Sequence, residues 1–123
     1  MKIAITAAGK DLKSQVDPRF GRCANFIVYD IETGVFQVYS NSGVAAAGGA
    51  GSQAAQTVAN SGAEAVITGN LGPNAARALE ELKIPVFKFD SGTVAEAVKA
   101  YKDGKLPSIS GPTVSSHAGM RKT

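Results

Sequence analysis

FIVYDIETGVFQVY, residues 26–39, consists of two runs of β-branched and aromatic residues joined by a Glu-Thr-Gly turn. Such runs favour β-strands, and a short connection containing glycine between two of them predicts a hairpin. We therefore expect antiparallel strands at residues 26–31 and 35–39. This hairpin argues against a doubly wound sheet in which every strand is parallel.

The segments on either side of the hairpin complete an α/β pattern. Residues 2–8 form a predicted first strand, with Ile3 and Ile5 on one of its faces. After the hairpin, helices are expected to begin at Ser52, at Pro73 and at the capping box of Thr93 and Glu96, and strands are expected at residues 65–68 and 86–89.

The resulting element order, βββαβαβα, restricts the topology. Crossovers between parallel strands are right-handed, which predicts an α/β fold with a five-stranded mixed sheet of order 3-2-1-4-5 and three helices. This strand order is that of ribonuclease H-like domains. A chain of 123 residues with 44% hydrophobic content fits a single domain, which we assign to residues 1–104. Residues 105–123 are rich in Pro, Gly and Ser, and we expect them to form a flexible C-terminal tail.

The composition excludes several classes of protein. One cysteine and one histidine cannot form an internal disulfide, an all-cysteine zinc site or a histidine-rich metal centre within one chain. A net charge of +3, evenly scattered, does not indicate nucleic-acid binding. The N-terminus lacks the apolar run of a signal peptide, and no stretch approaches the ~20 apolar residues of a membrane span. We expect a soluble, cytoplasmic protein without a nucleic-acid or membrane partner.

The carboxyl edge of the predicted sheet is the expected ligand site. Four loops, at residues 9–25, 41–51, 69–73 and 90–92, meet there with the N-termini of all three helices. Helix N-termini carry unpaired N–H groups and partial positive charge. Because the first loop also carries two lysines and two arginines, this edge should suit an anion.

Two glycine-rich segments of this edge admit two interpretations each. The loop containing Gly49 and Gly51 could cradle an anion with its backbone N–H groups, or it could be a flexible connection to the helix. Its partial likeness to a dinucleotide fingerprint is weak, because the strand at residues 65–68 ends in Thr68 rather than an acid. The turn at residues 68–74, TGNLGPN, could approach a ligand closely or serve only as a turn.

Cys23 and His117 are the candidate metal ligands. Cys23 follows Arg19 and Arg22 and should lie near helix N-termini, surroundings that lower a thiol pKa and favour a thiolate ligand for iron or copper. The alternative is a small buried thiol that packs like alanine. His117, in the predicted tail, would be either solvated or a ligand if the tail folds back.

No catalytic residues are identified. The first strand contains no acid, so the carboxylates that hold two metal ions in a nuclease are missing. Walker, nucleophile-elbow and histidine acid–base patterns are also absent from the sequence. We expect a protein that is not an enzyme.

Three blocks resemble the dinitrogenase iron–molybdenum cofactor biosynthesis family: residues 17–23 (DPRFGRC), 49–55 (GAGSQAA) and 65–75 (AVITGNLGPNA). The resemblance covers about residues 1–103 and implies a ribonuclease H-like fold. Nitrogen-fixation members bind or carry iron–molybdenum cofactor or its iron–sulfur precursor. By this resemblance, the ligand loop contains Arg19, Phe20, Gly21 and Cys23, with Arg22 between them, and the facing rim contains Gly49, Gly51, Gly69, Asn70 and Gly72.

The sequence and the resemblance together predict a non-enzymatic carrier of an iron–sulfur or iron–molybdenum type cofactor or its precursor, with residues 1–104 as the cofactor-binding domain. One thiolate per chain cannot supply four cluster ligands, so the cluster would be transiently bound. The expected partners are metal-cluster donor and acceptor proteins, and the chain would be a monomer or a weak homodimer. Alternatives are a small-molecule module that senses an anion such as phosphate and, less favoured, a dinucleotide-dependent oxidoreductase.

Overall fold

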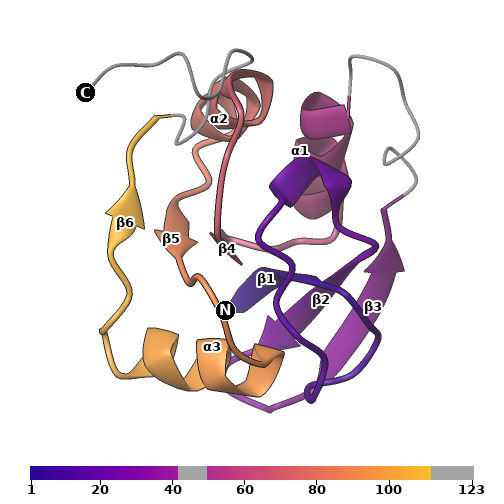
Figure 1. The fold of residues 1–123 in the computed structure, drawn as a ribbon, viewed down its shortest axis with the longest axis vertical. Helices are drawn as coiled ribbons and strands as arrows, with labels where there is room; N and C mark the ends of the chain where they lie inside the picture. Colours follow the sequence, from indigo (N-terminus) through magenta and orange to yellow (C-terminus); the bar gives the residue numbers. More distant parts are fainter. Residues whose placement is uncertain (42–49, 112–123) are drawn as a thin grey trace.

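The computed structural model describes residues 1–41 and 50–111. Its elements follow the predicted order, with a short 3-10 helix and a final strand in addition (Figure 1). They are β1 (Lys2–Ala7), η1 (Phe20–Arg22), β2 (Asn25–Asp30), β3 (Phe36–Ser40), α1 (Ala50–Asn60), β4 (Ala65–Thr68), α2 (Pro73–Glu81), β5 (Val86–Lys88), α3 (Val94–Lys102) and β6 (Ser108–Ile109).

The sheet is mixed, as predicted, but it has six strands in the order β3-β2-β1-β4-β5-β6. β2 runs antiparallel to both β1 and β3, whereas β4 and β5 are parallel to β1. The hairpin and the relative order of the first five strands are therefore confirmed.

The prediction of five strands is wrong because β6 adds to the edge formed by β5. Val86 pairs with Ile109 in antiparallel register, and the backbone N–H of Lys88 donates to the carbonyl of Pro107 at 2.8 Å. Ile109 also packs against the buried core. Two residues are too few to show a strand period, so the composition of this segment indicated only a tail.

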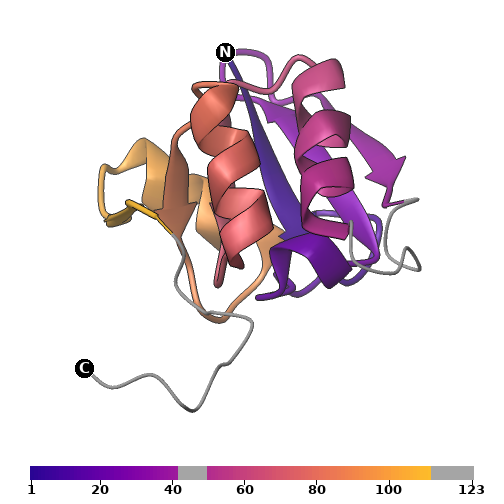
Figure 2. The ribbon, with the colours of Figure 1, turned by 90° about the horizontal axis from the view of Figure 1, so that it is seen from above.

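The helices form layers on both faces of the sheet (Figure 2). α1 and α2 lie side by side on one face, where their apolar side chains meet Ala4 and Val28 in the first core cluster. α3 covers the other face, where Ile3 and Ile5 of β1 join the second cluster. The alternation of β1 thus divides its side chains between the two layers.

Local sequence signals set the two later helices. Thr93 Oγ1 accepts from the backbone N–H of Glu96 at 3.1 Å, and Glu96 Oε1 accepts from that of Thr93 at 2.8 Å, which confirms the capping box. α2 begins at Pro73 as predicted. α1 begins at Ala50, two residues before the expected cap at Ser52. In the part of the chain described, no helix is long and apolar enough to cross a membrane.

Candidate functional site

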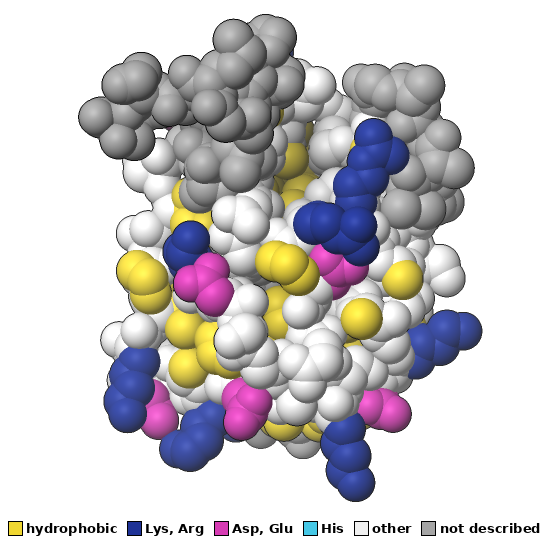
Figure 3. Space-filling view, in the orientation of Figure 1, with side chains coloured by type: hydrophobic (Ala, Val, Ile, Leu, Met, Phe, Trp, Pro, Cys, Tyr) yellow, Lys and Arg dark blue, Asp and Glu magenta, His cyan; other side chains and the backbone are white. Residues whose placement is uncertain are grey.

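A cleft of about 370 Å³ lies at the carboxyl edge of the sheet, between η1 and the N-termini of α1 and α2. In Figure 3 a group of cationic side chains lies beside a hollow in the upper part of this face, and hydrophobic side chains are visible within the hollow. The residues described along the cleft are Arg19, Phe20, Gly21, Arg22, Ala50, Gly51, Asn70, Gly72, Pro73, Asn74 and Ala75.

A segment that we call the strap, residues 17–20, carries Arg19 and Phe20 across the ends of β1 and β4. At one end, Asp17 N–H donates to the carbonyl of Thr6 at 2.9 Å, and Thr6 Oγ1 donates to the carbonyl of Asp17 at 2.6 Å. Further along, Asn70 N–H donates to the carbonyl of Pro18 at 2.7 Å. The strap is thus hydrogen-bonded to the chain at the ends of two neighbouring strands.

Asp17 holds the guanidinium of Arg19 through two side-chain contacts. Arg19 Nε donates to Asp17 Oδ1 at 3.1 Å and Arg19 Nη2 donates to Oδ2 at 3.0 Å, while the backbone N–H of Arg19 also donates to Oδ1 at 3.0 Å. The hydrogen bond and the charge of Asp17 raise the pKa of Arg19. The Asp17 side chain is only 7% exposed and that of Arg19 is 65% exposed, so a buried acid supports an accessible cation.

Two of the three helix N-termini reach the cleft. A Cβ added to Gly21 would lie 3.1 Å from the backbone N of Gly51, and one added to Gly51 would lie 3.0 Å from the backbone N of Ala75. The backbones of η1, α1 and α2 therefore approach closely where no side chain separates them. At α2, Gly72 is an N-cap without a side-chain hydrogen bond, which leaves the first N–H groups of that helix uncapped by a side chain.

The expectation that α3 also contributes its N-terminus is wrong. Val94 N–H donates to the carbonyl of Ser14 and Ala95 N–H donates to that of Leu12, each at 2.9 Å. The first loop thus covers this helix end with its own carbonyl groups. Lys10 and Lys13 of the same loop do not line the cleft, so Arg19 and Arg22 are the cations among its described residues.

The prediction of an accessible Cys23 with a lowered pKa is also wrong. Cys23 has no exposed surface, packs in the first core cluster and places Sγ 3.3 Å from the carbonyl of Phe20. Burial, with a smaller contribution from the charge of Asp17, raises the pKa of Cys23 to about 12. The alternative interpretation, a small buried thiol, describes this residue.

Asn41 fixes the turn that follows the strap. Its side chain is buried, and Nδ2 donates to the carbonyls of Gly21 at 3.1 Å and Cys23 at 2.9 Å. Neither Asn41 nor Asp17 is among the site residues predicted from the sequence. The spacing of Asp17 and Arg19, with one residue between them, could have indicated the ion pair, but no local signal indicates the contacts of Asn41.

Most of the predicted cofactor-binding residues lie together in the cleft, although their binding role stays a prediction. Gly69 lies beneath the strap, where an added Cβ would be 2.7 Å from Cβ of Pro18. Gly49 and His117 lie outside the described residues. The predicted residues that line the cleft are Arg19, Phe20, Gly21, Arg22, Gly51, Asn70 and Gly72.

The described residues offer no clustered metal ligands. Within residues 1–41 and 50–111, no group of three or more His, Cys, Asp or Glu side chains could hold a metal ion. The cleft lining described above also contains none of these four residue types. Its chemistry is that of two guanidinium groups, backbone N–H groups and small apolar surfaces, which suits recognition of an anion without direct metal coordination.

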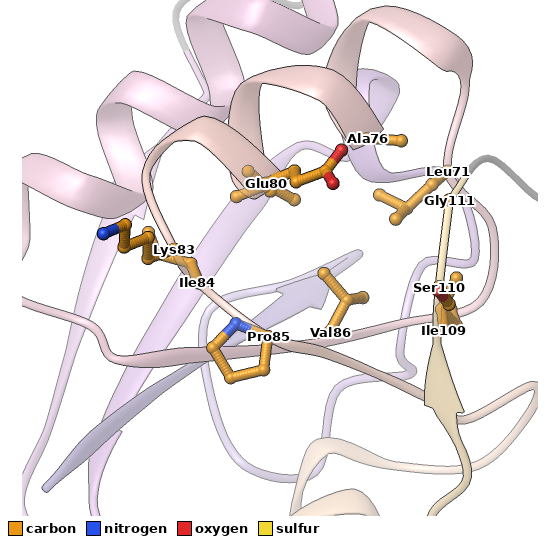
Figure 4. Close-up of a pocket in the computed structure, with 11 residues that line it drawn as sticks. Leu71, Ala76, Glu80, Lys83, Ile84, Pro85, Val86, Ile109, Ser110 and Gly111 are labelled. Carbon is orange, nitrogen blue, oxygen red and sulfur yellow. The ribbon is translucent and has the colours of Figure 1, made fainter.

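A second cleft, of about 330 Å³, lies between α2 and β6. Figure 4 shows Glu80 on α2 above Val86, with Ile109 on the neighbouring strand. None of the predicted site residues within the described ranges lines it.

The chain matches a known protein family over most of its length. A family model described as dinitrogenase iron–molybdenum cofactor matches residues 1–104. The chain belongs to this family. An uncharacterized protein of Methanocaldococcus jannaschii is 32% identical to this chain over 109 residues, which are 86% of this chain and 89% of that protein.

Solved structures agree with this membership of the iron–molybdenum cofactor family. The apo form of the orange protein from Desulfovibrio gigas superposes with a TM-score of 0.88 at 41% identity, covering 91% of this chain and 95% of that one. A putative NifB protein from Thermotoga superposes with a TM-score of 0.78 at 39% identity, covering 87% and 91%.

Proposed function

We propose that this protein binds and carries an iron–sulfur or iron–molybdenum type cofactor, or a precursor of one, without catalysing a reaction on it. The observation that carries the proposal is the cleft, where Arg19 and Arg22 lie beside the N-termini of α1 and α2. Metal–sulfur clusters are commonly anionic, and this arrangement of positive groups suits an anion. Membership of the iron–molybdenum cofactor family supports the same ligand class.

The burial of Cys23 shapes the mode of binding that we propose. A thiol with no exposed surface and a raised pKa is a poor source of thiolate, so the cluster would be held by charge and hydrogen bonds from the cleft. Such a ligand can leave without breaking a coordinate bond between a metal and the protein. Transient binding of this kind fits exchange with cluster donor and acceptor proteins, which we propose as partners.

The test is the visible absorption spectrum of protein purified without oxygen and then incubated with iron, molybdate and sulfide. We expect charge-transfer bands in the wild-type protein, weaker bands in Arg22→Gln and unchanged bands in Cys23→Ser. Lys99→Gln is the matched control, because it removes one positive charge from α3, on the other face of the sheet. A colourless wild-type protein, without bound metal or sulfide, would refute the proposal.

A second candidate is a module that senses a small anion such as phosphate. The absence of acids, imidazole and thiol from the described lining of the cleft favours it, because phosphate needs donors and no metal ligand. The result that would establish this function instead is a colourless protein whose melting temperature rises with added phosphate. In Arg22→Gln, phosphate would then raise the melting temperature by less.

A further inference from the structure

We propose that Asp17 is a positioning residue for the anion cleft, and that it acts by fixing the guanidinium of Arg19. The inference rests on the proposed anion-binding function and deepens it. It assigns a role to a buried acid that lies beside the cleft but does not line it.

The geometry of the ion pair leaves a defined edge of Arg19 for a ligand. A guanidinium has five N–H donors in a rigid plane. Asp17 occupies the edge made by Nε and one proton of Nη2. The edge that remains consists of Nη1 and the second proton of Nη2, which is again a parallel pair of donors that matches an oxyanion or a sulfide pair. Asp17 therefore selects which edge of Arg19 is presented.

Asp17 can perform this role because its own position is set by the sheet. Its backbone N–H and carbonyl both bond to Thr6, at 2.9 and 2.6 Å. Thr6 Oγ1 lies 2.9 Å from Thr68 Oγ1, and both threonines are fully buried. Asp17 is thus anchored at the ends of β1 and β4, and it in turn holds the side chain of Arg19, which is otherwise mostly exposed.

Charge alone gives the opposite expectation, which makes the inference testable. A carboxylate next to a cleft lowers its positive potential, so removing that charge should strengthen the binding of any anion. Fixing the guanidinium has the reverse consequence, because an arginine released from Asp17 must be ordered again when the ligand binds. The sign of the change in affinity distinguishes the two roles.

The experiment measures pyrophosphate binding by isothermal titration calorimetry at fixed pH and ionic strength. Asp17→Asn is compared with Asp103→Asn, which removes the same charge from an exposed pair, Lys99 and Asp103, on α3. We expect about tenfold weaker binding in Asp17→Asn, the upper end of the usual cost of ordering one released side chain on binding, and little change in Asp103→Asn. Tighter binding in Asp17→Asn, or no measurable binding by the wild-type protein, would overturn the inference.

Arg19→Lys tests the same role without altering the buried acid. It keeps the charge but loses the planar fork, so we expect it to weaken pyrophosphate binding as much as Asp17→Asn does, and the double variant to be no weaker than either. Unchanged affinity in Arg19→Lys, or independent losses that add in the double variant, would contradict the inference.

The Arg19 Nε–H resonance should be observable in the wild-type protein and lost in Asp17→Asn; its persistence would also contradict it.

These results separate the inference from the proposed function. A protein that shows this pattern with pyrophosphate yet takes up no metal–sulfur cofactor retains the positioning role and refutes the carrier function. A protein that takes up the cofactor while Asp17→Asn binds pyrophosphate more tightly retains the carrier function and refutes the positioning role.

Discussion

Gly69→Ala tests whether the strap must lie directly against the end of β4. The added Cβ would lie 2.7 Å from Cβ, 2.9 Å from Cα and 3.2 Å from the carbonyl oxygen of Pro18. Carbon atoms pack at about 3.5–4.0 Å, so the strap would have to move by roughly 1 Å. None of these three atoms belongs to the far end of a flexible side chain, which makes the movement expensive. The displacement also strains the hydrogen bond from Asn70 to Pro18.

We expect Gly69→Ala to lower the free energy of unfolding by about 1–3 kcal/mol, the usual range for overpacking. Gly72→Ala is the matched control, because a Cβ there has no neighbour within 4 Å. Its change should stay within about 0.5 kcal/mol, since the gain from a stiffer unfolded chain offsets a slightly poorer N-cap. Urea denaturation measures both. Equal stability of the two variants would show that the strap is not held against Gly69.

Two further predictions concern the buried thiol and the last strand. Burial raises the pKa of Cys23 from 9.0 to about 12. Above pH 9 the unfolded chain therefore loses its thiol proton while the folded chain keeps it. The free energy of unfolding should then fall by about 1.4 kcal/mol per pH unit. Urea denaturation of wild type and Cys23→Ala between pH 8 and 10 checks this, and identical slopes would contradict it. Truncation after Gly104 removes the pairing of β6 with β5 and the packing of Ile109, so the melting temperature should fall; an unchanged melting temperature would show that β6 does not stabilise the sheet.

The elements that the sequence predicted well are those with local causes. The turn between β2 and β3 and the capping box of Thr93 and Glu96 depend on residues a few positions apart, and both are confirmed. β6 has no such signal, because its pairing depends on an edge of β5 that exists only in the folded sheet. Its two residues are held by tertiary contacts that no local pattern contains.

The candidate site shows the same division between local and long-range causes. Topology placed the residues around Arg19 and Asn70 at one edge of the sheet, and the structure brings them into one cleft. The burial of Cys23 is one of the two interpretations that the sequence leaves open, because the choice between them depends on how η1, Asn41 and the core close around the sulfur. The neighbouring arginines indicated an exposed thiolate, whereas desolvation dominates its pKa.

The contacts among Gly21, Gly51 and Ala75 bear on how the cleft can vary among related proteins. A Cβ added to Gly21 or Gly51 would lie 3.1 or 3.0 Å from a backbone nitrogen of the next element, so a side chain at either position would have to push two elements apart. A change in ligand size among related proteins is therefore easier to accommodate at lining residues that already carry side chains, such as Arg22 and Asn74. The close contacts of the two glycines would then stay the same while these side chains differ, so related proteins with one backbone would differ in the ligands that fit the cleft.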